Sequence, residues 1–382
     1  MSANQEIERT PKPIGHLQLV EARNYKGAIL DQIAEASKSI HIKTMNFQLT
    51  RMQDGKEVPD EDVTDILTAI IERKKSTPSL DIHLKFDNRT IISSSTQKQN
   101  SKSKLRRIEE LRDANIRVSI TKRNPFEAVM TSLPVLGPIA AKVLRDHRKV
   151  VVFDERIALI GGMNLSYDDM HRPDVMVGIV ASNDTPESLR MVMALERYVF
   201  NDSILPGDVR LRFNDRGNTE ILVDTGFPGR SGIRQEATNI ISTANTEGSI
   251  YVSTQYFPNG SIEKQLQLAA LQGTKVTIIV SEEEIVKSEP YIQSAIKRGK
   301  ERNSHIENLT IVQIPEWVHA KTILRLAPPN SGGTNRVMIG SHNWDKWGVL
   351  AGTQEAVIAT SDPGLITQTQ DFFDTTINTA NN

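Results

Sequence analysis

Hydrophobic and polar positions follow two recurring patterns along the chain. Runs with an apolar residue every three or four positions, such as DILTAIIERKKS (65–76), predict amphipathic helices. Short apolar runs such as LDIHLKFD (80–87) predict strands. The two patterns alternate at the spacing of α/β units, so the sequence predicts an α/β fold in which helices cover a sheet.

An internal repeat indicates that this fold occurs twice. The segment SIHIKTMNF (39–47) aligns without a gap on SIYVSTQYF (249–257), with identical residues at four of nine positions. Each copy follows a helical run and precedes a second helical run and another strand, so the chain is predicted to form two similar α/β halves. A Pro-Gly turn in NDSILPGD (201–208) suits the boundary between them.

The predicted organisation has three parts, namely a polar N-terminal tail (1–14), a first half (15–205) and a second half (206–382). The length of 382 residues leaves room for two domains, each with its own core. Each half is expected to carry one copy of the motif described below.

Composition excludes several kinds of chemistry. The chain has no cysteine, which excludes disulfides, thiolate metal sites and cysteine nucleophiles. It has 46 Lys and Arg against 47 Asp and Glu, so it lacks the overall positive charge typical of nucleic-acid-binding proteins, although a local basic patch remains possible. Catalysis would therefore depend on His, Lys, carboxylates or hydroxyls.

No targeting or membrane-spanning segment is predicted. The N-terminus has acids and prolines where a signal peptide needs a basic start and an apolar core. The most apolar stretch, Phe126 to Leu144, is interrupted by charged residues, prolines and a glycine. It is either an interfacial membrane element or a core helix and loop. A cytoplasmic protein is expected, peripheral to the membrane if this stretch is interfacial.

The strongest chemical signal lies in HRKVVVFDERIALIGGMN (147–164). His147 and Lys149 are two apart on a strand-like run, so both side chains point to one face. DER is read as a hairpin turn and IALIGG as the returning strand, which brings Asn164 back beside them. An imidazole, an ammonium and a carboxamide on one face are suited to binding and attacking a phosphate.

The second half repeats this arrangement with a longer hairpin. His319 and Lys321 are again two apart, and Asn343 follows the returning strand. The spacing from His to Gly is 21 here against 14 in the first copy, so roughly seven residues have entered the hairpin tip, APPNSGGTN (327–335).

These residues resemble the phospholipase D superfamily, whose motif is HxKxxxxD, six residues, then GGxN or GSxN, present twice per active site. The first copy matches at every position, including Asp154, Gly161 and Gly162. The resemblance extends from about His16 to the C-terminus, and residues 254–280 are similar to bacterial cardiolipin synthases. It implies two α/β/α sandwich halves related by a pseudo-twofold axis, with the active site at their interface and no cofactor.

The second motif departs from the family at one position. It keeps Gly340 and Ser341, but Leu326 occupies the Asp position. Because that position is at the far end of the hairpin from the histidine, we expect the family's Asp to have a structural role.

The family also places an acidic residue downstream, which accepts a hydrogen bond from a catalytic imidazole. Asp174 lies 27 residues after His147. Glu355 lies 36 after His319, or about 29 once the insertion is removed. The two carboxylates are therefore expected to hold the imidazoles in the reactive tautomer.

The remaining candidates have weaker support. The acidic cluster YDDMHRPD (167–174) has no metal-site spacing, so no metal is predicted. Ordinary core or surface roles are expected for the other histidines, with a substrate contact open for the last: His16, His41, His83, His171, His305 and His342. For Trp317, Trp344 and Trp347, pocket lining and simple packing are about equally favoured.

The motifs favour a phosphodiester-cleaving enzyme that works by double displacement. The resemblance implies His147 as nucleophile and His319 as general acid, with the reverse assignment open. The substrate is expected to be a phospholipid at a membrane surface, and the reaction phosphatidyl transfer or hydrolysis. The alternative is a nuclease that uses the basic stretches 98–107 and 296–302. A non-catalytic binding module is disfavoured because both His-Lys pairs are present.

Overall fold

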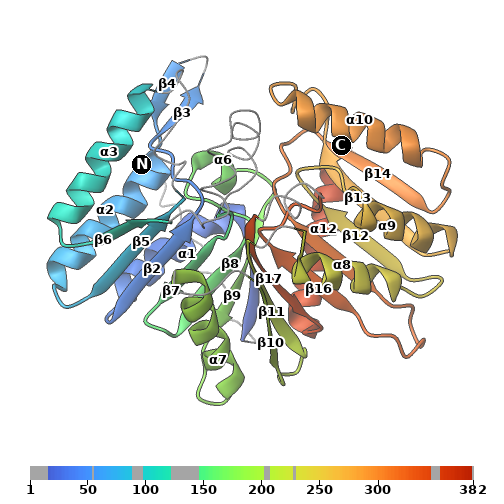
Figure 1. The fold of residues 1–382 in the computed structure, drawn as a ribbon, viewed down its shortest axis with the longest axis horizontal. Helices are drawn as coiled ribbons and strands as arrows, with labels where there is room; N and C mark the ends of the chain where they lie inside the picture. The colour runs from blue at the N-terminus through green and yellow to red at the C-terminus, as the bar shows by residue number, and fades with distance from the viewer. Residues whose placement is uncertain are drawn as a thin grey trace, which may run out of the picture.

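The computed structural model describes residues 16–53, 56–87, 98–121, 146–201, 207–226, 229–345 and 353–380. Two large sheets lie side by side (Figure 1). The first has the strand order β1-β9-β8-β7-β2-β5-β6, and the second has the order β10-β11-β17-β16-β15-β12-β13-β14. The prediction of an α/β fold made of two repeated halves is confirmed.

The first sheet is built from residues 17–180. Its strands are β1 (Leu17–Glu21), β2 (Ser39–Thr44), β5 (Asp81–Phe86), β6 (Arg117–Ile120), β7 (Val150–Phe153), β8 (Ile157–Gly161) and β9 (Val175–Val180). Its helices are α1 (Ala22–Glu35), α2 (Glu61–Ser76), α3 (Lys98–Asp113), α6 (Tyr167–Met170), α7 (Pro186–Leu195) and a π-helical turn, η3 (Glu196–Phe200). A separate hairpin consists of β3 (Thr50–Gln53) and β4 (Lys56–Pro59).

The second sheet is built from residues 208–360. Its strands are β10 (Asp208–Phe213), β11 (Thr219–Thr225), β12 (Ser249–Ser253), β13 (Lys275–Ser281), β14 (Leu309–Ile314), β15 (Thr322–Leu326), β16 (Arg336–Gly340) and β17 (Gln354–Thr360). Its helices are α8 (Gly232–Ser242), α9 (Ser261–Leu271), α10 (Pro290–Asn303) and α12 (Pro363–Ala380).

The halves correspond strand by strand. In each, three parallel strands (β2, β5, β6 and β12, β13, β14) continue into an antiparallel hairpin (β7–β8 and β15–β16) and one further strand (β9 and β17). The sequence repeat falls on β2 and β12. The Thr44 hydroxyl donates to the carbonyl of Asn46 at 2.8 Å, and the Thr254 hydroxyl donates to that of Tyr256 at 2.7 Å.

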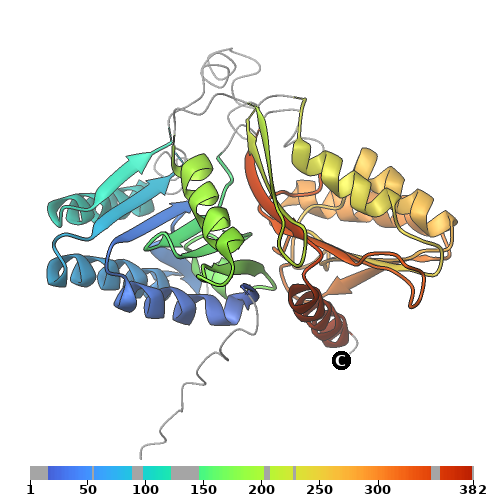
Figure 2. The same cartoon turned by 90° about the horizontal axis from the view of Figure 1, so that it is seen from below.

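Three apolar cores hold these layers together. Helices α1–α3 cover one face of the first sheet, and α8–α10 cover one face of the second (Figures 1 and 2). The third core joins the two halves, because it contains residues from both sheets and from α7 and α12. The two motif hairpins contribute to this shared core, so its burial fixes their relative positions.

Candidate active site

The two motif hairpins form as the sequence predicts, but His147 and Lys149 precede β7 instead of lying on a strand, and His319 and Lys321 likewise precede β15. In the first, β7 and β8 pair antiparallel around the turn 154–156, and in the second, β15 and β16 pair around the inserted loop 327–335. The motif glycines are required by close approach of the next strand. A Cβ on Gly161 would lie 2.4 Å from the carbonyl oxygen of Val175, and one on Gly340 would lie 2.5 Å from that of Ala356.

The Asp154 side chain forms hydrogen bonds that hold the first hairpin turn in place. The residue lies in the left-handed region at φ 52°, and its carboxylate accepts the backbone N–H groups of Ser37, Lys38 and Ser39 at 2.7–3.0 Å. These bonds fasten the hairpin turn to the chain entering β2. Leu326 of the second motif instead lies in β15 opposite Ser249 of β12, with the inserted loop following it.

Each motif histidine contacts the carboxylate of the opposite half. His319 donates from Nδ1 to Asp174 Oδ2 at 2.6 Å. His147 Nδ1 lies 3.1 Å from the Glu355 carboxylate and 2.9 Å from the carbonyl oxygen of Ser341. The family resemblance predicted a contact between each carboxylate and an imidazole, but it did not show that the pairs would be crossed.

The backbone repeats this crossed arrangement. The N–H of His147 donates to the carbonyl of Gln354 at 2.8 Å, and the N–H of His319 donates to that of Pro173 at 3.0 Å. Gln354 and Pro173 each precede the carboxylate that contacts the same imidazole. Because Nδ1 is the donor in both rings, Nε2 is the atom of each ring that can attack phosphorus or carry the reactive proton.

The two carboxylates have different immediate surroundings. Gly162 leaves room for Asp174, since a Cβ there would lie 2.4 Å from Asp174 Oδ1. At the matching position, the hydroxyl of Ser341 donates to Glu355. Burial raises the pKa of Glu355 to about 7. His342 when it is protonated, Lys149, the Ser341 hydroxyl and Lys321 favour its charged form.

Lys149 and Lys321 are both almost completely buried, at 1% exposure. Each ammonium donates to the carbonyl of the histidine two residues earlier, Lys149 at 2.7 Å. Burial lowers the pKa of Lys149 to about 7, and it also lowers the pKa of Lys321. A bound phosphate would favour the charged form of both lysines.

The two asparagines are not equivalent. The side-chain amide of Asn164 donates to Asp169 at 2.7 Å, and its oxygen accepts the backbone N–H of Asn46 at 3.3 Å. The side-chain oxygen of Asn343 is buried without a hydrogen bond among the described residues. Asn164 is thus held in a network, whereas that oxygen of Asn343 is not.

Sequence reasoning missed the role of Asp169. It belongs to the acidic cluster 167–174 and lies on α6, where Ser166 caps the helix. Its Oδ1 is 3.7 Å from His319 Nδ1. Burial opposes its ionisation, but the nearby charges of His319 and Lys321 lower its pKa to about 2. The Ser cap three residues before it was the available sequence signal.

Most other candidates lie outside the centre. His16 bonds to Asp215, His83 to Ser119 and His171 to Asp62. His41 contacts Glu196 and Asp81, and His305 is exposed. His342 is the exception, because it is buried beside Glu355 and His147 with neither ring nitrogen hydrogen-bonded among the described residues.

The tryptophans divide between packing and contact roles. Trp344 is fully buried, and its Nε1 donates to the carbonyl of Ser253 at 3.3 Å. Arg172 lies 4.8 Å from the ring centre of the half-buried Trp317. Trp347 and the apolar stretch 126–144 are outside the described residues. Within the described ranges, no set of three or more His, Asp or Glu is placed to hold a metal ion.

Two α/β halves that each supply one His-Lys pair, with carboxylates exchanged across their interface, define a phospholipase D-like protein. The family described as "Cardiolipin synthase, PLD-like domain" matches residues 29–191 and 238–377, so the chain belongs to that family. The superfamily resemblance found in the sequence is confirmed.

The individual relatives have low sequence identity to this chain. Probable cardiolipin synthase YwiE of Bacillus subtilis (strain 168) is 27% identical over 151 residues, which are 36% of this chain and 29% of that protein. Phosphatidylserine synthase of Haemophilus influenzae Rd KW20 has 16% identity and a TM-score of 0.68, over 94% of this chain and 85% of that one. Polyphosphate kinase of Porphyromonas gingivalis has 16% identity and a TM-score of 0.54, over 94% of this chain and 49% of that one. At these identities the two structures share the fold with this chain.

Proposed function

We propose that the chain cleaves the phosphodiester bond of a phospholipid and transfers the phosphatidyl group through a phosphohistidine. The observation that carries this proposal is the crossed pairing of His147 with Glu355 and of His319 with Asp174. Both imidazoles are oriented by carboxylates in the way that acid–base and nucleophilic catalysis require. Membership of a cardiolipin synthase family supports phospholipid as the substrate class.

In the first step, Nε2 of neutral His147 attacks phosphorus and a P–N bond forms. The P–O bond to the leaving group breaks, and protonated His319 gives its proton to the departing oxygen. In the second step, water or an alcohol gives its proton to His319 and attacks phosphorus, and the P–N bond breaks. The product is a phosphatidic acid when water attacks and a new phosphatidyl ester when an alcohol attacks.

The buried lysines supply charge to this reaction. Lys149 and Lys321 follow the histidines by two residues and would stabilise negative charge on the non-bridging oxygens of the phosphate. Asn343 would donate to the same oxygens from its amide. For Asn164, one amide hydrogen is already bound to Asp169, which leaves a single donor for the substrate.

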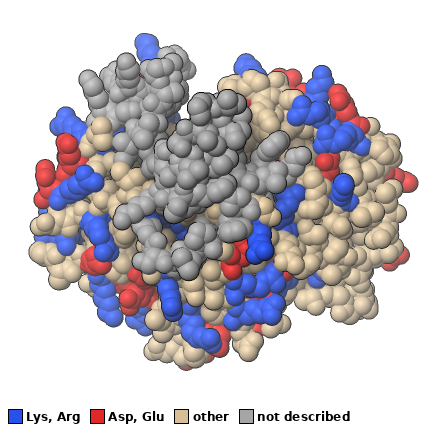
Figure 3. All heavy atoms as spheres, in the orientation of Figure 1, with Lys and Arg blue, Asp and Glu red and all other residues tan. Residues whose placement is uncertain are grey.

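Several described side chains of the basic segments that would serve a nuclease contact the protein itself. On α3, Lys104 is buried against Phe47, and Arg106 and Arg107 bond to Glu110. On α10, Lys300 bonds to Gln313 and Glu283, and Arg302 bonds to Glu263. Both signs of charge are scattered over the described part of the face in Figure 3. These contacts favour phospholipid over nucleic acid.

A membrane surface as partner and a cytoplasmic location are further parts of this proposal. Within the part of the chain that the structure describes, no helix is long and apolar enough to cross a bilayer. The apolar stretch 126–144 is the sequence feature that supports contact with a membrane. Flotation with vesicles of phosphatidylglycerol tests this contact, and failure to bind them would contradict it.

Labelled phosphatidylglycerol and labelled DNA, incubated separately with the protein, distinguish the substrate classes. We expect new phosphatidyl products from the lipid and intact DNA. His147→Ala and His319→Ala should each abolish turnover while remaining folded, because neither step proceeds with one imidazole. His305→Ala is the matched control, since this exposed histidine is outside the site. Cleaved DNA with unchanged lipid, or near-normal activity of either active-site variant, would contradict the proposal.

A further inference from the structure

A second buried carboxyl lies behind Glu355. Asp224 on β11 is the direct antiparallel partner of Glu355 on β17, so both side chains project from the same face of the sheet. Directly opposed residues place their Cβ atoms about 4.5–5.5 Å apart. Both residues are only 4% exposed. Two carboxyl groups therefore share one water-poor site, and one of them is the partner of His147.

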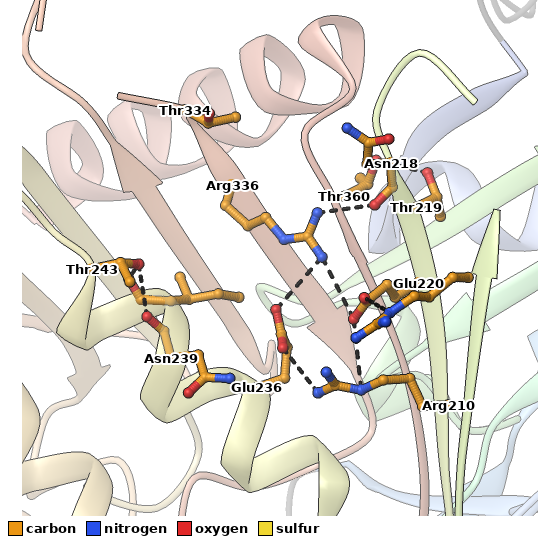
Figure 4. A network of polar contacts seen from close by, with 12 residues as sticks. Arg210, Asn218, Thr219, Glu220, Glu236, Asn239, Thr243, Thr334, Arg336 and Thr360 are labelled. Carbon is orange, nitrogen blue, oxygen red and sulfur yellow. Dashed lines mark hydrogen bonds and ion pairs between the residues drawn. The ribbon is translucent and has the colours of Figure 1, made fainter. Parts of the chain in front are cut away.

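The contacts of Asp224 differ from those of another carboxylate on the same face of the same strand. Glu220, four residues earlier, lies within 4 Å of Arg210 and Arg336 (Figure 4). It also lies 2.8 Å from Arg212. Within the described ranges, Asp224 forms no ion pair with a Lys, Arg or His. The Ser231 hydroxyl, at the N-terminus of α8, donates to its Oδ2, and its Oδ1 is buried without a hydrogen bond. The negative charge of Glu220 is thus neutralised by arginines, whereas a negative charge on Asp224 would have no cationic partner among the described residues.

The other charged neighbours of Asp224 do little to stabilise its ionised form. From β10, Asp208 is its direct partner and adds a third acid to the row. Burial raises the pKa of Asp224 to about 8, and the charges of Asp208 and Glu355 act in the same direction, while the Ser231 hydroxyl and the Ile233 N–H oppose them. Around Glu355 the cations are Lys149, Lys321 and His147 when protonated. His342 is neutral near pH 7, because burial lowers its pKa to about 4.

The geometry points to Asp224 as a positioning residue that shares one proton with Glu355 and so sets the charge behind His147. In the working state Asp224 carries the proton, and Glu355 is the anion that accepts the imidazole N–H. When the pair loses its last proton, two negative charges lie behind His147 and its protonated form is favoured. The catalytic consequence rests on the function proposed above, whereas the shared proton does not.

Carboxyl titration tests the pair directly. In protein labelled with ¹³C at Asp and Glu carboxyl carbons, the wild type should show two linked steps, the upper one near neutral pH or above. Asp224→Asn and Glu355→Gln should each leave a single step, at lower pH than the upper step of the wild type. The matched control is Asp208→Asn, which removes an exposed acid that is outside the proposed pair. Because the charge of Asp208 raises the pKa of Asp224, this variant should keep two linked steps and move the upper one to lower pH. If removing either carboxyl leaves the titration of the other unchanged, the sharing is refuted.

The rate profile separates a positioning role from a merely structural one. Asp224→Asn keeps an acceptor for Ser231, so its turnover of a small soluble phosphodiester near pH 7 should fall less than about tenfold. Its pH profile should lose the ionisation seen at the upper step. A profile parallel to that of the wild type would overturn the positioning role. Absence of turnover in the wild type, together with a two-step titration, would refute the proposed function and leave the proton pair intact.

A second variant covers the case in which Asp224→Asn fails to fold. Ser231→Ala removes the hydroxyl that stabilises charged Asp224 and keeps both carboxyls. The upper step should then move to higher pH. An unmoved upper step would overturn the proposal.

Discussion

The motif carboxylate Asp154 should hold the fold together without taking part in the reaction, and replacing it with Ala tests this division. Its side chain bridges the β7–β8 turn to the chain entering β2 through three backbone N–H groups and the Ser37 hydroxyl. Ala removes all of these bonds. It also places a residue without local hydrogen bonding at φ 52°, where Asn and Asp are better tolerated.

The expected cost follows from the exposure of each partner. Ser37 and Lys38 are exposed, so water can replace the lost acceptor at their N–H groups. Ser39 is buried, and its N–H would be left unsatisfied at a cost of about 1–3 kcal/mol. Strain in the left-handed region adds about 1 kcal/mol. Asp154→Ala should therefore lower the free energy of unfolding by about 3 kcal/mol.

Urea unfolding and turnover per folded molecule measure the two sides of this prediction. Asp154→Asn is the matched control, because it tolerates the backbone conformation and keeps one acceptor, and should cost about 1 kcal/mol. In both variants the turnover of the folded fraction should stay near that of the wild type. Normal stability with lost turnover would show that Asp154 acts in the chemistry and would refute the structural role.

Four further outcomes are expected. Gly162→Ser should reduce turnover sharply, because its Cβ would lie 2.4 Å from Asp174; unchanged turnover in a folded variant would contradict the crowding at that contact. Burial raises the pKa of Glu355 from 4.5 to about 7, so ionisation of this carboxyl lowers the free energy of unfolding as the pH rises through that window. In urea unfolding, Glu355→Gln should therefore be more stable than the wild type by about 3 kcal/mol at pH 8 and equal to it at pH 4.5. An equal difference at both pH values would contradict this linkage. Leu326→Asp should leave the rate unchanged, because the inserted loop alters that turn, and a large gain would show that the missing acid limits the site. Turnover should survive EDTA, whereas loss that zinc or magnesium reverses would mean that a metal takes part.

The overall architecture could be predicted from the sequence because it depends on repeated local patterns. The repeat 39–47 and 249–257 placed two equivalent strands, and the His-Lys spacing placed two equivalent hairpins. The structural role of Asp154 also followed from its position at the hairpin tip. Each of these inferences needed only the side-chain period of a strand and the residue preferences of turns.

The features that sequence reasoning missed depend on contacts between distant segments. The exchange of Asp174 and Glu355 between halves follows from how the sheets meet, and no spacing within one half encodes it. Asp169 and Asp224 belong to no motif, and their surroundings come from α6 and from the neighbouring strands of the second sheet. Long-range packing decides such environments, and packing was not visible in a single sequence.

The exchange of carboxylates also bears on how such a chain could arise. A gene for one half would encode a histidine and a carboxylate that cannot meet each other, but two identical copies related by a twofold axis would complete both pairs. Tandem duplication and fusion of that gene would join the copies and let them diverge. The divergence visible here is matched within each copy: Gly162 stands beside the shorter acid Asp174, and Ser341 beside the longer acid Glu355. In each half the acid and the residue beside it therefore match in size, while the histidine that this acid contacts belongs to the other half.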